Sequence, residues 1–285
     1  MSSSMTRREF VQTATAAGAG MALASAASKA AAGQFTGKLK KAVVYNMIGG
    51  DLSVMDKFKL LKDTGFDGVE IRVRDDVPPE EAVRAVEETG IVVHGVMLGS
   101  VDGIDEAVDL TKAYGGTSVL LVAGRVNENM PYAENYVETQ AKIREAIPHA
   151  EEQQIKLLVE NVWNNFLLSP LEMRQYIDEL ESEWVGAYFD IGNVVRFGWP
   201  EHWIPVLGER IHRLHVKEYS RDKQMNEGLW KGFDVEIGEG SIDWAAVRAE
   251  LAKINYEGWV TAEVGGGGRE RLAEIAARMD NVLDL

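Results

Sequence analysis

The chain has 285 residues, of which 46% are hydrophobic and 26% are charged, a composition typical of a globular protein. Its 45 acidic residues outnumber its 30 basic residues, and the net charge of −15 argues against nucleic acid and anionic membranes as partners. The absence of cysteine excludes disulfides, thiolate metal sites and cysteine nucleophiles.

The first 32 residues have the features of an export signal. The pair Arg7-Arg8 precedes a segment rich in Ala and Gly, residues 13–27, and small residues spaced as in a signal cleavage site end at Ala32. This order resembles the twin-arginine signal with which bacteria export folded proteins. We therefore expect residues 1–32 to be a signal segment and the protein to be exported, either periplasmic or secreted. An alanine-rich tail and a membrane anchor are the alternatives.

After this segment, short apolar runs rich in β-branched residues alternate with segments whose apolar residues recur every three or four positions. The runs predict eight strands: Ala42–Ile48, Gly68–Val73, Ile91–Leu98, Ser118–Ala123, Lys156–Val162, Gly186–Ile191, Ile211–Val216 and Gly258–Val264. The segments between and after them predict eight helices: Val54–Lys62, Pro79–Glu88, Ile104–Tyr114, Glu134–Gln153, Leu171–Glu181, Pro200–Leu207, Trp244–Lys253 and Arg269–Leu283.

Strands that alternate with helices indicate βαβ units and a parallel sheet, and eight such units match the size of a (β/α)8 TIM barrel. Because no linker rich in Gly, Pro or Ser divides the chain, we expect residues 38–285 to form one α/β domain. A doubly wound open sheet is the main alternative. It is disfavoured because residues 46–50, after the first strand, lack the glycine fingerprint that binds phosphate in such folds.

Four late strands carry a polar residue near the carboxyl end, where the active sites of such barrels lie. These residues are Glu160, Asp190, His215 and Glu263. Because side chains alternate between the faces of a strand and the neighbours of these residues are apolar, we predict that all four point into the barrel. Three carboxylates cannot stay ionised there without compensation, which one divalent metal ion would supply. The donor set suits Mn²⁺, with Mg²⁺, Co²⁺, Zn²⁺ and Fe²⁺ as alternatives, whereas a set of surface acids is the other interpretation.

Four further residues are candidates for binding a substrate. Lys217 shares the inward face of His215 and could bind a substrate oxygen or form a salt bridge with an acid at the rim. Asn193 could bind a hydroxyl group, although it also fits an ordinary turn. Arg221 could meet a polyhydroxyl or anionic ligand or be solvated, and Trp163 could stack on a sugar ring or pack against the protein.

Two inward positions on the second predicted strand, Glu70 and Arg72, have opposite charges, and we expect them to pair with each other. His94, on the third predicted strand, has apolar neighbours and is interpreted as a structural histidine. None of these three residues is assigned to the site.

A divalent metal ion beside paired glutamates suggests proton abstraction next to a sugar carbonyl. The ion would bind the carbonyl and hydroxyl oxygens and stabilise an enediolate, while a glutamate removes the carbon-bound proton. If Glu160 and Glu263 lie on opposite faces of the substrate, the second can return the proton and invert the centre, which is 3-epimerisation. A single base would instead support aldose–ketose isomerisation, and departure of a β-hydroxyl or glycosidic oxygen would give elimination.

The second half of the chain also resembles a known family. Three stretches are similar to the xylose-isomerase-like sugar epimerase/isomerase superfamily: Glu160–Trp163, Phe166–Pro170 and Tyr188–Asn193. Three more resemble its L-ribulose/L-xylulose-5-phosphate 3-epimerase branch, also described as hexulose-6-phosphate isomerase-like: Gly198–Ile204, Leu207–Ile211 and His215–Glu218. The resemblance implies a TIM barrel with a divalent metal ion held by Glu160, Asp190, His215 and Glu263.

The resemblance further implies that Glu160 and Glu263 are the two acid/base residues. In relatives that act on free ketoses, an arginine placed like Arg221 binds the substrate, and a histidine stands where this chain has Asn193. We therefore expect a metal-dependent 3-epimerase or isomerase that acts on a small ketose or sugar phosphate. We expect no stable insertion into a membrane, and the protein could form a homo-oligomer. The alternatives are a lyase, dehydratase or hydratase of keto-sugars or keto-glycosides, and a non-catalytic secreted sugar-binding protein.

Overall fold

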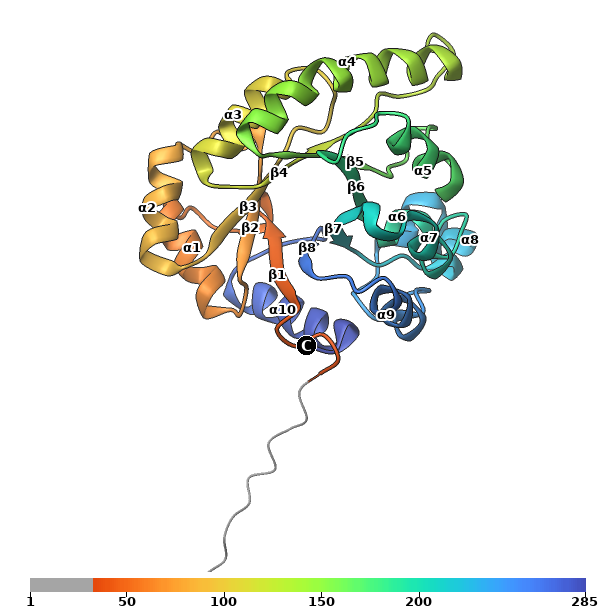
Figure 1. The fold of residues 1–285 in the computed structure, drawn as a ribbon. Helices are drawn as coiled ribbons and strands as arrows, with labels where there is room; N and C mark the ends of the chain where they lie inside the picture. Colours follow the sequence, from red (N-terminus) through yellow and green to blue (C-terminus); the bar gives the residue numbers. More distant parts are fainter. Residues whose placement is uncertain (1–32) are drawn as a thin grey trace, which may run out of the picture. The chain divides into compact units, whose positions relative to one another are not determined.

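The structure, a computed structural model, describes residues 33–285. Eight parallel strands form a closed barrel in which neighbours in the chain are neighbours in the sheet and the last strand pairs with the first (Figure 1). This confirms the predicted TIM barrel, whereas the predicted signal, residues 1–32, lies outside the described residues. The strands are β1 (Leu39–Val44), β2 (Gly68–Arg72), β3 (Val92–Met97), β4 (Ser118–Leu121), β5 (Lys156–Glu160), β6 (Val185–Asp190), β7 (Ile211–Val216) and β8 (Gly258–Ala262).

Helices surround the barrel and alternate with its strands (Figure 1). They are α1 (Val54–Asp63), α2 (Pro79–Thr89), α3 (Ile104–Tyr114), α4 (Tyr132–Gln153), α5 (Pro170–Asp178), α6 (Ile191–Val194), α7 (Pro200–Leu207), α8 (Arg221–Glu227), α9 (Trp244–Lys253) and α10 (Arg269–Leu283). Short 3₁₀ helices are η1 (Tyr45–Met47), η2 (Val73–Asp75), η3 (Gly208–Arg210) and η4 (Leu229–Phe233). The sequence pattern does not predict α6, which has four residues, or α8, which buries none of its residues.

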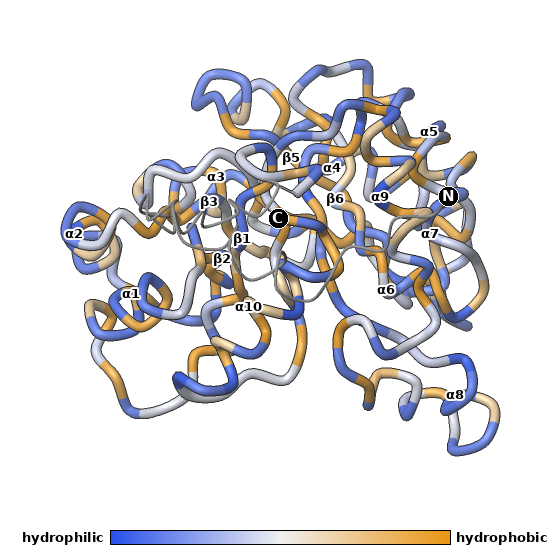
Figure 2. The backbone as a smooth tube through the Cα atoms, turned by 90° about the horizontal axis from the view of Figure 1, so that it is seen from below, coloured by the Kyte–Doolittle hydropathy of each residue, from blue (hydrophilic) through white to orange (hydrophobic). Residues whose placement is uncertain are grey.

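Local signals explain where several helices begin and end. The side chains of Ser53, Ser169 and Asp243 accept hydrogen bonds from the first-turn amides of α1, α5 and α9, which would otherwise lack partners. Hydrophobic and hydrophilic residues alternate along the surrounding helices (Figure 2), since one face packs on the barrel and the other meets water. Within residues 33–285, no helix combines the length and the apolar character that crossing a membrane requires.

The apolar residues of the strands divide between the two sides of the barrel wall. Leu157 and Val159 belong to the large core between strands and helices, whereas Leu158 belongs to a separate cluster with Leu120 and Tyr188. Because side chains alternate along a strand, this second cluster fills the interior of the barrel. The carboxyl-terminal residues of the same strands therefore point into the mouth above a packed interior.

Most predicted strands run past the observed carboxyl ends. The strand predicted to reach Val162 ends at Glu160, and the first strand ends at Val44 because the next three residues form η1. Met47 and Ile48 remain buried, so the apolar pattern continues after strand pairing has stopped. The loops at this end of the barrel therefore begin directly at the polar residues.

Gly68, at the start of β2, offers a test of the barrel packing. A Cβ atom there would lie 2.5 Å from the Trp259 ring and 2.7 Å from the carbonyl oxygen of Val92. We expect Gly68→Ala to lower the free energy of unfolding by about 1–3 kcal/mol, because a tightly packed wall has no room for the methyl group. Gly265→Ala is the matched control, since no atom of the described chain lies within 4 Å of the added Cβ. Denaturant unfolding measures both variants, and equal midpoints would contradict the packing described here.

Candidate active site

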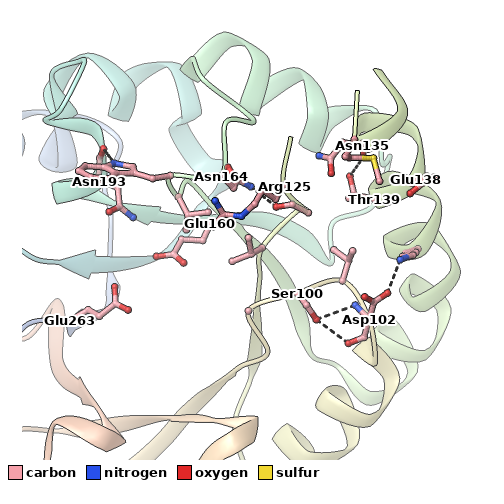
Figure 3. Close-up of a pocket in the computed structure, with 18 of the residues that line it drawn as sticks. Ser100, Asp102, Arg125, Asn135, Glu138, Thr139, Glu160, Asn164, Asn193 and Glu263 are labelled. Carbon is pink, nitrogen blue, oxygen red and sulfur yellow. Dashed lines mark hydrogen bonds and ion pairs between the residues drawn. The ribbon is translucent and has the colours of Figure 1, made fainter. Parts of the chain in front are cut away.

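Four side chains converge at the carboxyl ends of β5, β6, β7 and β8. One ligand atom from each of Glu160, Asp190, His215 and Glu263 lies within 4.8 Å of the other three. His215 Nδ1 is 2.8 Å from Glu160 Oε1, 3.6 Å from Glu263 Oε2 and 3.9 Å from Asp190 Oδ2. The first three residues are buried and Glu263 is partly exposed, and the carboxylates of Glu160 and Glu263 are turned toward each other (Figure 3).

The barrel register and a set of amide contacts fix Asp190. Asp190 pairs with His215 in the register of β6 and β7, which brings the two side chains to the same level of the barrel. The backbone N–H of Asp190 donates to Asn161 Oδ1, and Asn161 Nδ2 donates to the Asp190 carbonyl, both at 2.8 Å. Asp190 Oδ1 accepts from the N–H of Asn193 at 2.8 Å and caps α6. Asp190 Oδ2 is left to face the cluster.

Lys217 supplies positive charge inside the cluster. Its Nζ lies 2.8 Å from Asp190 Oδ2 and also forms an ion pair with Glu263. Of the two predicted roles of Lys217, the salt bridge is therefore observed. Gly192 leaves room for the Lys217 side chain, because a Cβ atom at residue 192 would overlap Cγ of Lys217.

Burial and neighbouring charges separate the proton affinities of the cluster. Burial raises the pKa of Glu160 to about 7, against the lowering effect of His215, and it also raises the pKa of Asp190. Burial would raise the pKa of Glu263 as well, but Lys217 and His215 outweigh it and hold that pKa below its ordinary value. Burial lowers the pKa of His215, but Glu160 and Glu263 outweigh it, so that pKa lies well above its ordinary value.

The donor set fits a divalent cation. One imidazole nitrogen and three carboxylate oxygens are hard or borderline ligands, and they surround a single point at the mouth of the barrel. A cation bound there would compensate the carboxylates that burial otherwise favours in the protonated form. The residues present are thus chemically suited to the predicted metal ion.

Two predicted substrate-binding residues, Asn193 and Trp163, line the same cavity as the cluster. Asn193 Nδ2 donates to the Asn161 carbonyl at 3.0 Å, and Trp163 Nε1 donates to the Asn193 carbonyl at 2.9 Å. The rings of Trp230 and Phe233 pack against Trp163 with centroids 5.0 and 4.9 Å away. An aromatic wall therefore stands beside the polar cluster.

The structure does not bring Arg221 to this cavity. Its Nε donates to the Val195 carbonyl at 3.0 Å and its Nη2 to the Gly198 carbonyl at 2.6 Å, while the guanidinium lies over the Trp199 ring. These contacts tie α8 to the segment between α6 and α7. A role of Arg221 in substrate binding stays a prediction.

The cavity has a volume of about 710 Å³, within the ordinary range of small-molecule sites. It extends from Glu160 and Glu263 past Arg125 to the region of Ser100 and Asp102 (Figure 3). Sequence reasoning misses these last residues, because they lie in loops or short turns without a periodic pattern. The position of a loop after a barrel strand is the only signal that could have indicated them.

The predicted pairing of Glu70 with Arg72 is wrong. Glu70 Oε2 accepts hydrogen bonds from Tyr188 Oη and lies against His215 Nε2, both at 3.0 Å. Arg72 instead pairs with Asp75 of η2, with Nη2 2.6 Å from Oδ1. The two residues part because Arg72 ends β2 beside the following turn, whereas Glu70 lies deeper, where β6 and β7 face it across the barrel.

The chain is similar to known proteins over most of its length. The family described as xylose isomerase-like TIM barrel matches residues 58–282. An Escherichia coli protein provisionally named L-ribulose-5-phosphate 3-epimerase SgbU is 27% identical over 245 residues, 73% of this chain and 82% of the relative. The 2-oxo-tetronate isomerase of Pectobacterium atrosepticum is 22% identical over 262 residues, 81% of this chain and 93% of the relative. The 3-keto-D-glucoside 4-epimerase YcjR of Escherichia coli shares the fold, with a TM-score of 0.71 at 16% identity over 86% of this chain and 99% of that one.

The raised pKa of Glu160 predicts how the metal-free protein responds to pH. The pKa of Glu160 in the folded protein is about 7, above the ordinary value of 4.5. Protonated Glu160 therefore contributes stability that is fully present below pH 4.5 and is lost as the pH rises through 7. Glu160→Gln removes the cost of a buried charge. We expect its stability advantage over the native protein to grow between pH 5 and pH 8 by on the order of 2–3 kcal/mol.

Urea unfolding of both proteins in the presence of a chelator, at several pH values, measures this advantage. Glu145→Gln, an exposed change on α4, is the control and is expected to show no such trend. A constant difference between native protein and Glu160→Gln across this range would contradict the prediction.

Proposed function

The chain belongs to the family of xylose isomerase-like TIM barrels, and on this premise we propose that it is a sugar epimerase or isomerase that depends on a divalent metal ion. The observation that carries the proposal is the meeting of Glu160 and Glu263 with an aspartate and a histidine, all within 4.8 Å, at the inner end of a cavity. The relatives named as a 3-epimerase and an isomerase support the same reaction class.

The metal ion would be held by Glu160, Asp190, His215 and Glu263. When bound, a divalent cation such as Mn²⁺ polarises a substrate carbonyl and offsets the negative charge that develops as an adjacent proton leaves. Asp190 does not line the cavity, and its proposed role is to hold the ion. Lys217, in contact with Asp190 and Glu263, balances the remaining carboxylate charge.

Two glutamates with different proton affinities suit an exchange of protons at carbon. Glu263, whose pKa is lowered, is ionised at neutral pH and can remove the proton next to the carbonyl. Glu160, whose pKa burial raises in the metal-free protein, would deliver a proton of its own to the opposite face of the same carbon. Transfer in the reverse direction uses the same two residues with their roles exchanged.

The cavity walls indicate a polyhydroxyl substrate. Asn193 presents an amide beside the cluster, and Trp163 with Trp230 presents aromatic surface, which suits the apolar face of a sugar ring. Trp230 is 69% exposed and lies at the outer edge of this wall. We infer that the reacting sugar lies over the glutamates with its ring beside Trp163.

Elimination from a keto-glycoside is a second candidate reaction. A second cavity of about 540 Å³ shares Lys217, Phe233 and Glu263 with the first. Glu263 thus lines both cavities, which suits a substrate that carries a further group beyond the reacting sugar. Loss of that group after proton removal would make the enzyme a lyase.

Export is proposed from the sequence of residues 1–32. Changing both Arg7 and Arg8 to Lys is expected to retain the protein in the cytoplasm, because the twin-arginine pathway requires the arginine pair. Cell fractionation of a bacterial host measures the distribution, and Lys29→Gln is a control that leaves the pair intact. Equal export of the double variant and the native protein would count against this localisation.

Solvent exchange tests the proposed chemistry. Metal-loaded protein with candidate ketoses in deuterated water is expected to place deuterium beside the carbonyl, and Glu160→Gln and Glu263→Gln are each expected to slow this exchange by about 10²–10⁴-fold. Nuclear magnetic resonance and mass spectrometry of the sugars measure the exchange. Glu145→Gln is the matched control, since it removes an exposed carboxylate outside the cavity.

The products separate the candidates. Loss of water or of a glycosidic group would favour the lyase. Bound but unchanged sugars, without exchange, would contradict any catalytic function and favour a sugar-binding protein.

A further inference from the structure

A fourth carboxylate, that of Glu70, lies beneath the cluster. Glu70 on β2 and His215 on β7 are both fully buried, and Glu70 Oε2 is 3.0 Å from His215 Nε2. On the other side of the same ring, Nδ1 is 2.8 Å from Glu160 Oε1. The imidazole is therefore held between a carboxylate of the cluster and a carboxylate inside the barrel.

A chain of hydrogen bonds through side chains of β3, β8 and β6 leads to the same oxygen of Glu70. Tyr188 Oη lies 3.0 Å from Glu70 Oε2 and 3.1 Å from Thr261 Oγ1, and Thr261 Oγ1 lies 2.9 Å from His94 Nε2. Each hydroxyl group has one hydrogen, so all donors in this chain must point the same way. The position of the hydrogen on His94 decides which way.

The protonation state of His94 indicates that the hydrogen bonds of this chain are donated toward Glu70. Burial, with Arg213 and His215 nearby, lowers the pKa of His94 well below its ordinary value, so its ring is neutral and carries one hydrogen. His94 Nδ1 is buried and has no hydrogen-bond partner in residues 33–285. An unpaired buried acceptor is tolerated more readily than an unpaired N–H, which places the hydrogen on Nε2. His94 then donates to Thr261, Thr261 to Tyr188, and Tyr188 to Glu70.

We propose that Glu70 is a positioning residue that keeps a hydrogen on His215 Nε2, so that Nδ1 is the nitrogen that faces the three carboxylates and gives up its hydrogen when a metal ion binds among them. Nδ1 is then the nitrogen that holds the metal ion of the proposed function, on which this part of the inference rests. Carboxylates in contact with the second nitrogen of a ligating histidine orient the ring in this way and raise its basicity. Glu70 acts through His215 and does not reach the cavity.

The two oxygens of Glu70 make graded variants informative. Oε2 accepts both donors, whereas Oε1 has no hydrogen-bond partner among the described residues. A glutamine can thus keep its carbonyl oxygen toward Tyr188 and His215, while it loses the charge and places its NH2 group at the position of Oε1. A leucine loses the acceptor as well and releases the ring.

Metal affinity is the first measurement. With Mn²⁺ and Zn²⁺ as probes in competition with a chelator, we expect the dissociation constant to rise by about 10-fold in Glu70→Gln and towards 100-fold in Glu70→Leu. Glu218→Gln is the matched control, because Glu218 is buried outside the cluster and accepts from Trp244 Nε1 and the Gly238 amide. We expect it to lower the unfolding midpoint without changing metal affinity.

The protonation site of His215 is the second measurement. Nitrogen resonances of labelled histidine in the Zn²⁺-loaded native protein are expected to show hydrogen on Nε2 and zinc on Nδ1, a pattern retained in Glu70→Gln. Zinc on Nε2, or unchanged affinity in Glu70→Gln, would overturn the proposal, whether or not Glu70→Leu folds. If the native protein binds no divalent metal, the proposed function fails. In that case the Nε2 hydrogen bond to Glu70 in the metal-free protein still tests the positioning role.

Discussion

Mutual repulsion among Glu160, Asp190 and Glu263 is the constraint on which the arrangement of the site depends. Three carboxylates within 4.8 Å of His215 cannot all be ionised at the mouth of a barrel unless positive charge lies among them. His215 and Lys217 supply that charge, the first from β7 and the second from the position directly after this strand. Lys217 contacts Glu263, whereas Glu160 contacts His215. The chemistry proposed for the two glutamates follows from this difference in their positively charged neighbours.

This difference has a structural origin. Glu263 follows β8 at the edge of the mouth, where it contacts Lys217 and remains partly exposed. Glu160 ends β5 inside the wall, where its contact is the imidazole and burial dominates. Two residues of the same type therefore differ in proton affinity, because Lys217 lowers the pKa of Glu263 whereas burial dominates at Glu160.

The four residues of the cluster could be predicted because they obey local rules. Alternation along a strand decides which side Glu160 faces, and the order of strands in a TIM barrel decides that it meets Asp190 and His215. The partner of Glu70 could not be predicted in this way, because it depends on which side chains meet across the barrel. The contacts of Arg221 depend on the conformations of two loops, which no periodic pattern encodes.

The interior of the barrel supports the mouth in two layers. Leu120, Leu158 and Tyr188 fill the space below the cluster, and the Tyr188 hydroxyl lies at the boundary between apolar packing and the buried polar chain. A hydrogen-bonded network in such surroundings resists rearrangement, because each lost contact leaves a further buried polar atom without a partner. The orientation of His215 is therefore set from below, by the fold, before any ligand arrives from above.

The bare backbone of Gly192 has a consequence beyond its own turn. The Lys217 side chain passes over this residue at a separation that no Cβ atom permits. A methyl group at Gly192 would force the Lys217 side chain to move, and the ammonium of this side chain contacts both Asp190 and Glu263. One missing carbon atom, on a residue outside the cluster, thus leaves room for the side chain whose charge offsets that of the two acids.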